Sequence, residues 1–321
     1  MRTRRGGQAT PPNPWQQGLT GERFNIAHQG GAREGPSNTM WAIRHAVEVA
    51  GAQVIEGDVH PTAGDELVLC HDDTLNRTTN GDGKVSKHTL AQLRTLDAAY
   101  WWMPGKVDDH EAPSQFHPLR AAEGSPQVEE LRIPTLKDVL ERFSQPVIIE
   151  VKVKEAVLPL VRVLHELKVP AERIIVVAFD HAIVRKLREE DPQLPLAAPL
   201  LFAAWFFLCS RVGLRCSNGG FLALQVSHRF AWADFLTGTK RVVARFLAGL
   251  LLPERWRSFT VVDQRFVAAA HHAGMAVHVW TVDEAEEMEA LIDLGVDGIM
   301  TDCPTTLATV VANRADRTTR G

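Results

Sequence analysis

Short apolar runs that alternate with longer amphipathic segments are the feature that most limits how this chain can fold. Runs typical of strands recur from residue 24 to residue 301, and most are separated by a stretch with helical spacing. Consecutive strands joined by such helices pair in parallel, because a parallel connection has to cross back over the sheet. The sequence therefore predicts an α/β protein with a parallel sheet.

The expected elements follow in chain order. About nine strand candidates occupy 24–28, 54–59, 67–71, 147–152, 173–179, 196–200, 222–226, 276–281 and 296–301. The main helices are expected over about 37–50, 136–143, 155–168, 181–190, 262–272 and 284–294. Ser37 or Asn38 is a candidate cap for the first helix and Thr135 for the second. One connection, between 59 and 67, is a turn, so one unit is irregular.

Length and composition limit the class of protein. The chain has 321 residues, enough for one (β/α) barrel or two ordinary domains. A formal net charge of −4 does not favour nucleic acid as a partner. The four cysteines form no C-x-x-C pair, which indicates neither a zinc site nor a disulfide scaffold and favours a reducing, cytoplasmic setting.

The N-terminal residues 1–22 carry positive charge without an apolar centre, so we expect a disordered or loosely draped arm rather than a secretory signal. No run reaches the roughly 18–20 apolar residues of a membrane span. The nearest, at 194–208, is too short and contains two prolines.

Two carboxylates of one strand supply the first chemical signal. Glu56 and Asp58 are two residues apart, so their side chains point to the same face. Like charges on an apolar strand repel each other and are costly to desolvate, which favours a cation between them. Oxygen ligands suit Mg²⁺ or Ca²⁺ better than zinc. The alternative is an edge strand with a solvated polar face.

Other strands end in residues of the same kind. His28 ends the first strand and His71 ends the run that begins at Leu67, whereas Glu150 and Lys152 share a third strand at the same two-residue spacing. Together HQGG, EGD, HDDTLNRTTNG and IIEVK resemble the glycerophosphodiester phosphodiesterase family, within the phospholipase C-like phosphodiesterase superfamily. The resemblance covers roughly residues 24–310, in matching order and approximate spacing.

The resemblance implies a TIM-type (β/α)8 barrel with a small insertion after an early strand. The barrel would span 23–312, with the insertion at about 84–131 and a C-terminal tail at 313–321. In such a barrel the active-site groups lie at the carboxyl ends of the strands.

For these positions the resemblance implies a division of roles that phosphodiester chemistry explains. Glu56, Asp58 and Glu150 would bind a divalent cation, Mg²⁺ or Ca²⁺, that neutralises the phosphate. His28 and His71 would serve as general acid and base, in an order that the sequence leaves open. Lys152 would contact the phosphate or, alternatively, pair with Glu150. Trp280 would line the glycerol end of the pocket or, alternatively, pack in the core.

Two departures from the family pattern bear on substrate binding. Gln29 stands where the family has arginine after the histidine, and Ser37 stands where it has glutamate. Gln29 can still donate a hydrogen bond to phosphate, but it carries no charge. Glu34 is a candidate replacement for the missing carboxylate. Asp302, after the last strand, is expected to cap a helix or hold a loop.

The expected reaction is hydrolysis of glycerophosphodiesters to glycerol 3-phosphate and an alcohol. A lysophospholipase D-like or sphingomyelinase D-like activity is the second hypothesis, with a lysolipid substrate and peripheral membrane contact through 195–208. A catalytically retired binding protein on the same barrel, suggested by Gln29, is the third. The sequence does not indicate an oligomeric state.

Overall fold

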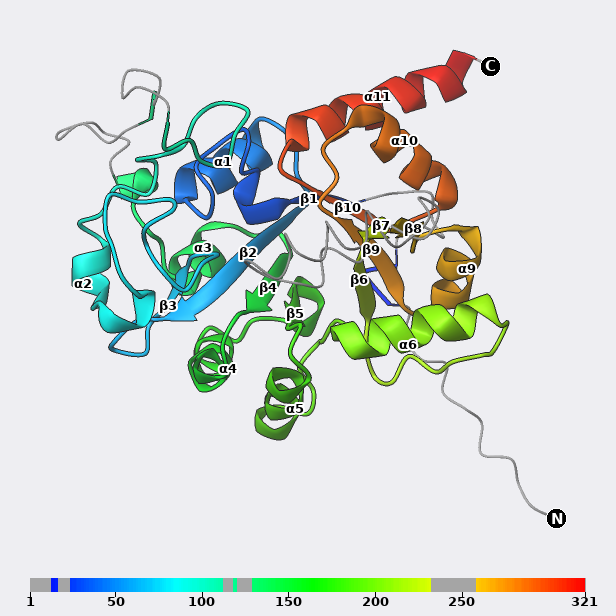
Figure 1. Cartoon of the computed structure of the whole chain (residues 1–321), viewed down its shortest axis with the longest axis horizontal. Helices are drawn as coiled ribbons and strands as arrows, with labels where there is room; N and C mark the ends of the chain where they lie inside the picture. The colour runs from blue at the N-terminus through cyan, green and yellow to red at the C-terminus, as the bar shows by residue number, and fades with distance from the viewer. Residues whose placement is uncertain (1–12, 17–23, 112–117, 120–128, 232–257, 321) are drawn as a thin grey trace, which may run out of the picture.

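A curled parallel sheet forms the centre of the computed structural model, which describes residues 13–16, 24–111, 118–119, 129–231 and 258–320 (Figure 1). Its strands follow the order β5-β4-β2-β1-β10-β9-β6, and every printed pairing along this path is parallel. The strands are β1 (Phe24–Ala27), β2 (Val54–Pro61), β4 (Val147–Val151), β5 (Ile174–Val177), β6 (Ala223–Ser227), β9 (Ala276–Trp280) and β10 (Gly298–Thr301).

A two-residue segment closes this sheet into a barrel. Leu196 makes a parallel bridge to Val176 of β5, and Ala197 makes one to Ala223 of β6. The sequence predicts a strand over 196–200, but the ladder stops early because Pro199 follows, has no N–H to donate and precedes a helix. With this segment in the eighth place, the fold is the expected (β/α)8 barrel.

Helices follow the strands and cover the outside of the barrel (Figure 1). They are α1 (Met40–Glu48), α3 (Leu136–Arg142), α4 (Val157–Glu166), α5 (His181–Glu190), α6 (Leu200–Arg211), α9 (Gln264–His272), α10 (Ala285–Leu294) and α11 (Pro304–Arg320). Thr135 caps α3 through a reciprocal box with Asp138, as expected. The cap of α1 is Thr39, not Ser37 or Asn38, because the Asn38 side chain contacts Asp58 instead.

The irregular unit lies where it was expected. β3 (Leu67–Leu69) pairs antiparallel with the end of β2. Between β3 and α3, the described residues form the short helix α2 (Leu90–Leu93) and the 3-10 turns η2 (Val85–Lys87) and η4 (Glu129–Leu131). These pack around a small core of their own. Parts of the expected insertion 84–131, at 112–117 and 120–128, lie outside the described residues.

A second excursion was not predicted. β7 (Arg229–Ala231) and β8 (Ser258–Thr260) pair antiparallel between β6 and α9. Three-residue strands carry too little periodicity to be recognised in a sequence. The 26 residues between them, 232–257, lie outside the described part of the chain.

Both expected termini need correction where they are described. Within the predicted arm 1–22, residues 13–16 pack on the barrel: Trp15 is 1% exposed, and the Asn13 amide donates to the carbonyl oxygens of Leu222 and Gly274. Residues 1–12 and 17–22 lie outside the described part. At the other end, helix α11 continues through Arg320, so the predicted tail 313–321 is helical as far as it is described. No described helix is both long and apolar enough to cross a bilayer.

His278 of β9 gives the barrel a pH-dependent stability. Its ring is fully buried beside the rings of Trp15 and Phe24, and burial lowers its pKa from 6.5 to about 4. Between pH 6.5 and about pH 4, His278 binds a proton in the unfolded chain but not in the folded chain. The stability of the fold therefore falls as the pH falls through this range.

We expect the free energy of unfolding to decrease by about 2 kcal/mol from this residue between pH 7.5 and 5. Urea unfolding of His278→Gln should show a correspondingly weaker dependence on pH than the parent chain. The exposed His181→Gln serves as the control and should keep the full dependence. An unchanged pH dependence in His278→Gln would contradict this account.

Candidate active site

Three acidic side chains meet on the neighbouring strands β2 and β4. Glu56 and Asp58 lie on the same face of β2, as the alternation of a strand requires, and Glu150 is the register partner of Asp58. One carboxylate oxygen from each residue lies within 4.8 Å of the other two. Glu56 is 3% exposed and Asp58 is fully buried. The predicted ligand set is therefore assembled in one place.

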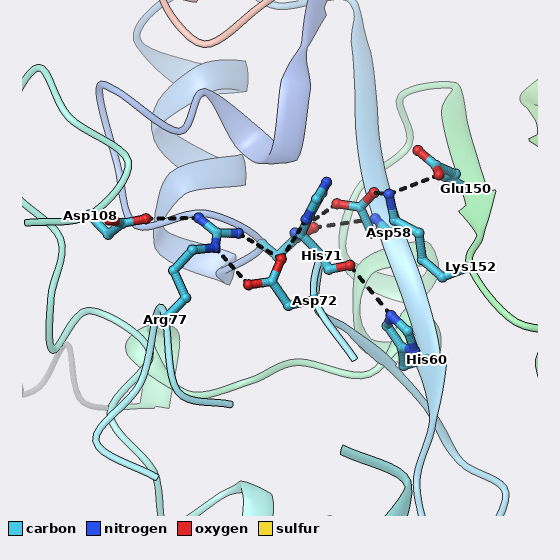
Figure 2. Close-up of polar contacts among 9 residues, drawn as sticks. Asp58, His60, His71, Asp72, Arg77, Asp108, Glu150 and Lys152 are labelled. Carbon is cyan, nitrogen blue, oxygen red and sulfur yellow. Dashed lines mark hydrogen bonds and ion pairs between the residues drawn. The ribbon is translucent and has the colours of Figure 1, made fainter. Parts of the chain in front are cut away.

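Lys152 lies between two of these acids (Figure 2). Its Nζ is 2.9 Å from Asp58 Oδ1 and 2.8 Å from Glu150 Oε1, so the pairing that was left as an alternative is present. Burial raises the pKa of Asp58, but the charge and hydrogen bond of Lys152, together with the charges of His71 and His28, outweigh burial and hold that pKa below its usual range. The pKa of Glu150 is raised, chiefly by burial.

One ammonium group does not balance three carboxylates, of which two are buried and the third is partly buried. Burial, reinforced by the charge of Asp58, raises the pKa of Glu56 to about 8. Asp58 Oδ1 is buried and has the Lys152 ammonium as its partner. An acidic cluster with more carboxylates than positive partners has the chemistry of a site for a hard divalent cation.

His28 follows β1 and is held by Asp302, which follows β10. The His28 Nδ1 atom is 2.6 Å from Asp302 Oδ1. In the pairing of β1 with β10, Ala27 lies opposite Thr301. His28 and Asp302, which come directly after these two residues, are therefore neighbours at the edge of the barrel. Because a carboxylate accepts hydrogen bonds, Nδ1 carries the proton and Nε2 is left for other partners.

Burial is the largest influence on the His28 pKa and lowers it. The hydrogen bond to Asp302 and the charge of Glu56, with further carboxylate charges, outweigh burial and raise the pKa to about 9. The expectation that Asp302 only caps a helix or holds a loop is therefore incomplete, since its side chain contacts a candidate catalytic residue. The rule that functional groups lie at strand ends, applied to the last strand, could have identified it.

His71 is oriented by a chain of charged residues from the irregular unit (Figure 2). Its Nδ1 is 2.7 Å from Asp72 Oδ1. Arg77 donates to both oxygens of Asp72 and, through Nη1, to Asp108. The hydrogen bond from His71 and the Arg77 guanidinium hold the pKa of Asp72 well below its usual range. The His60 Nε2 atom lies 3.4 Å from the His71 carbonyl oxygen. Sequence reasoning singled out neither Asp72 nor Arg77, although both lie in the HDDTLNR motif.

The loop after β1 braces the acids from the other side. The backbone N–H of Gln29 donates to Glu56 Oε2 at 2.9 Å, and the Asn38 amide donates to Asp58 Oδ2 at 3.1 Å. Both residues have positive φ, 51° and 58°, a conformation that asparagine tolerates better than most residues. Gln29 is 4% exposed. Glu34 accepts hydrogen bonds from Thr305 at the start of α11, so its carboxylate is used there rather than at the acid cluster.

Trp280 is at the carboxyl end of β9 and so at the same mouth of the barrel. Its ring makes an edge contact with Phe179, at 5.7 Å between centroids, and it also packs against the apolar cluster inside the barrel. The indole Nε1 atom is buried and has no hydrogen bond with the described residues. Phe179, which follows β5, is 40% exposed.

Known proteins are similar to this chain in sequence over most of its length. A glycerophosphodiester phosphodiesterase from Caldanaerobacter subterraneus subsp. tengcongensis is 29% identical over 294 residues, covering 89% of this chain and 96% of that protein. Lysophospholipase D GDPD1 of Homo sapiens is 29% identical over 302 residues, covering 90% and 86%.

Solved structures confirm the barrel. The glycerophosphoryl diester phosphodiesterase domain of an uncharacterized Mycobacterium tuberculosis protein superposes with a TM-score of 0.68 at 19% identity, covering 91% of this chain and 99% of that one. An Oleispira antarctica phosphodiesterase, solved with the product sn-glycerol-3-phosphate, gives 0.59 at 20% identity, covering 89% and 96%.

A family model gives the assignment. The model described as "Glycerophosphoryl diester phosphodiesterase family" matches residues 28–205 and 218–306. These ranges hold most of the chain and every residue of the site described above. The resemblance seen in the motifs is thereby confirmed, and the chain belongs to the glycerophosphoryl diester phosphodiesterase family.

Proposed function

We propose that this chain hydrolyses glycerophosphodiesters to glycerol 3-phosphate and an alcohol, with a bound divalent cation and two histidines. The observation that carries the proposal is the acid cluster of Glu56, Asp58 and Glu150 with two nearby histidines. His28 and His71 each have Nδ1 on a carboxylate, and the charges of both act on Asp58. The names of the relatives support the same reaction.

The residues present fit a divalent cation. Glu56, Asp58 and Glu150 would hold it, and their three negative charges with the one positive charge of Lys152 leave a surplus that a dication balances. All three are oxygen donors, which suits Mg²⁺ or Ca²⁺, and a carboxyl group whose pKa is raised, as that of Glu56 is, would lose its proton when it binds the ion. When bound, such an ion neutralises phosphate charge as it develops in the transition state.

The protein's own residues would move the protons. A hydrogen bond from Nδ1 to Asp302 leaves His28 Nε2 to exchange a proton with substrate, and Asp72 does the same for His71. One imidazole takes the proton of the attacking hydroxyl group, and the other gives a proton to the leaving alkoxide. Lys152 is bound between Asp58 and Glu150, so it positions the acids and adds positive charge near the phosphate.

Gln29 and Trp280 are the proposed uncharged contacts with the substrate, Gln29 with the phosphate and Trp280 with the glycerol. The Gln29 amide can donate one hydrogen bond to a phosphate oxygen where the family's arginine would donate two with a full charge. Trp280 and Phe179 present ring surface with a buried indole N–H that is free of hydrogen bonds among the described residues. Ring faces of this kind suit the carbon chain of glycerol.

An activity screen tests the reaction. Glycerophosphocholine, glycerophosphoethanolamine, lysophosphatidylcholine and sphingomyelin would be assayed with Mg²⁺ or Ca²⁺ and after chelation. We expect turnover of a glycerophosphodiester that chelation abolishes, and His28→Ala or His71→Ala should lower kcat by about 10²–10⁴-fold. Turnover that survives both chelation and His28→Ala would eliminate the mechanism, and absence of any turnover would favour the retired binding protein.

A lysophospholipase D-like activity is the second candidate. Phe179 at the mouth is 40% exposed and Leu201, in the first turn of α6, is 70% exposed, which offers apolar surface to an acyl chain. The human relative is named lysophospholipase D. A higher kcat/KM for lysophosphatidylcholine than for glycerophosphocholine would favour this candidate, and the reverse would favour the first.

Cation binding can be tested without turnover. We expect Asp58→Asn to weaken Mn²⁺ binding, followed by calorimetry or paramagnetic resonance, by at least about tenfold, because it removes a buried ligand charge. Asp73→Asn is the matched control, since that carboxylate lies nearby in sequence but is largely exposed and pairs only with Lys84 among the described residues. Equal binding by both variants would show that the ion is held elsewhere.

Asp302 is expected to act on catalysis through His28. Asp302→Asn keeps the backbone bonds of this residue to Arg33 and Asp283 but replaces an acceptor with an amide that can favour the wrong imidazole tautomer. We expect kcat to fall about a hundredfold or more with little change in KM. Mn²⁺ binding should be unchanged, and Asp302→Glu should restore part of the rate. A loss confined to KM or to thermal stability would assign Asp302 a structural role only.

A further inference from the structure

Helix α6 presents an apolar stripe to solvent. Leu201, Trp205 and Leu208 are 70%, 49% and 63% exposed, and their spacing of four and three residues places them on one face of the helix. The stripe continues past the helix end. The α6 stripe consists of Leu200, Leu201, Trp205, Leu208, Val212 and Leu214.

The opposite face of α6 already supplies the packing that the barrel needs. Ala203, Phe206 and Cys209 are buried, and the Phe206 ring packs against Phe266 of α9. The stripe is therefore apolar surface in excess of what this barrel helix requires. It contains six of the ten large hydrophobic residues that are exposed in the described part of the chain, while the other helices carry theirs singly. A contiguous exposed patch of this kind marks an interaction surface.

Charge around the stripe indicates the partner. The chain has 39 acidic residues among 321, yet none lies between Pro192 and Ala231. Arg211 and Arg215 lie at the C-terminal end of α6. Arg211 pairs with Asp263. Arg215 is exposed and has no ion pair with the described residues. Apolar side chains with a tryptophan, an arginine without an ion pair, and no acid in the same segment are the composition of a helix that lies on an anionic lipid surface.

A second copy of this chain fits the same charges poorly. A two-fold contact places the same patch on itself, so the Arg215 guanidinium groups would approach each other without an acid from 192–231 between them. Anionic lipid headgroups would instead pair with Arg215, because Arg211 already pairs with Asp263.

We propose that the α6 stripe rests on the surface of an anionic membrane. The helix starts directly after the eighth strand place of the barrel, so Leu200 and Leu201 lie at the same edge as the strand ends that carry the site. Membrane contact by this stripe brings the mouth of the barrel near the bilayer. The binding itself does not depend on the proposed reaction and is measured without turnover.

Vesicle co-sedimentation of the full chain tests the proposal. Phosphatidylcholine vesicles would be compared with vesicles containing about one third phosphatidylglycerol. We expect binding to the anionic vesicles that decreases at high salt. The double variant Leu201→Ser/Leu208→Ser should lose at least about tenfold in partition coefficient, since two leucine side chains no longer leave water. Arg215→Glu should reduce binding several-fold.

The matched control is Val49→Ser/Leu158→Ser, which removes two apolar side chains of similar exposure, 67% and 48%, outside α6. It should bind vesicles like the parent chain. Equal binding by the two double variants, or no binding by the parent, would overturn the proposal. A parent dimer in solution that Leu201→Ser/Leu208→Ser dissociates would assign the stripe to a second copy instead. A loss of several degrees in Tm for that variant alone would show that the chain itself covers the stripe.

Discussion

The gathering of three carboxylates, two buried and one partly buried, on two adjacent strands is the constraint on which the rest of this structure depends. Desolvation of an ionised carboxylate is costly unless opposite charge or hydrogen-bond donors compensate it. Here Lys152 pairs with two of the acids, the Gln29 N–H reaches Glu56 and the Asn38 amide reaches Asp58. The compensation is partial, and the raised pKa of Glu56 records the remainder.

This constraint explains two unusual features of the loop after β1. Gln29 and Asn38 both adopt positive φ, a conformation with a steric cost for residues other than glycine. Each is held there by a contact with a β2 carboxylate. The loop is thus folded around the acids, and a ligand that takes up their charge would also stabilise the loop.

The two histidines are supported by different parts of the fold. His28 depends on closure of the barrel, because Asp302 comes from the end of β10, the partner of β1. His71 depends on the irregular unit, because Asp72, Arg77 and Asp108 all follow β3. Arg77 neutralises the charge of Asp72 behind His71, whereas Asp302 pairs with no lysine or arginine among the described residues. The two imidazoles therefore lie in different electrostatic environments, which would suit the acid and the base of the proposed reaction.

The sequence by itself determined the local order of this protein: which segments become strands, which side chains share a face of β2, and which motifs mark the family. Strands and helices are recognised by apolar residues that recur every two or every 3.6 positions, and this pattern depends only on residues close together in the sequence. Tertiary structure decided the partners. The contact of His28 with Asp302 spans 274 positions, and the wide exposure of the α6 stripe depends on what the barrel leaves uncovered. An apolar run reads the same in a sequence whether it is buried or exposed, and distant strand ends become neighbours only when the barrel closes.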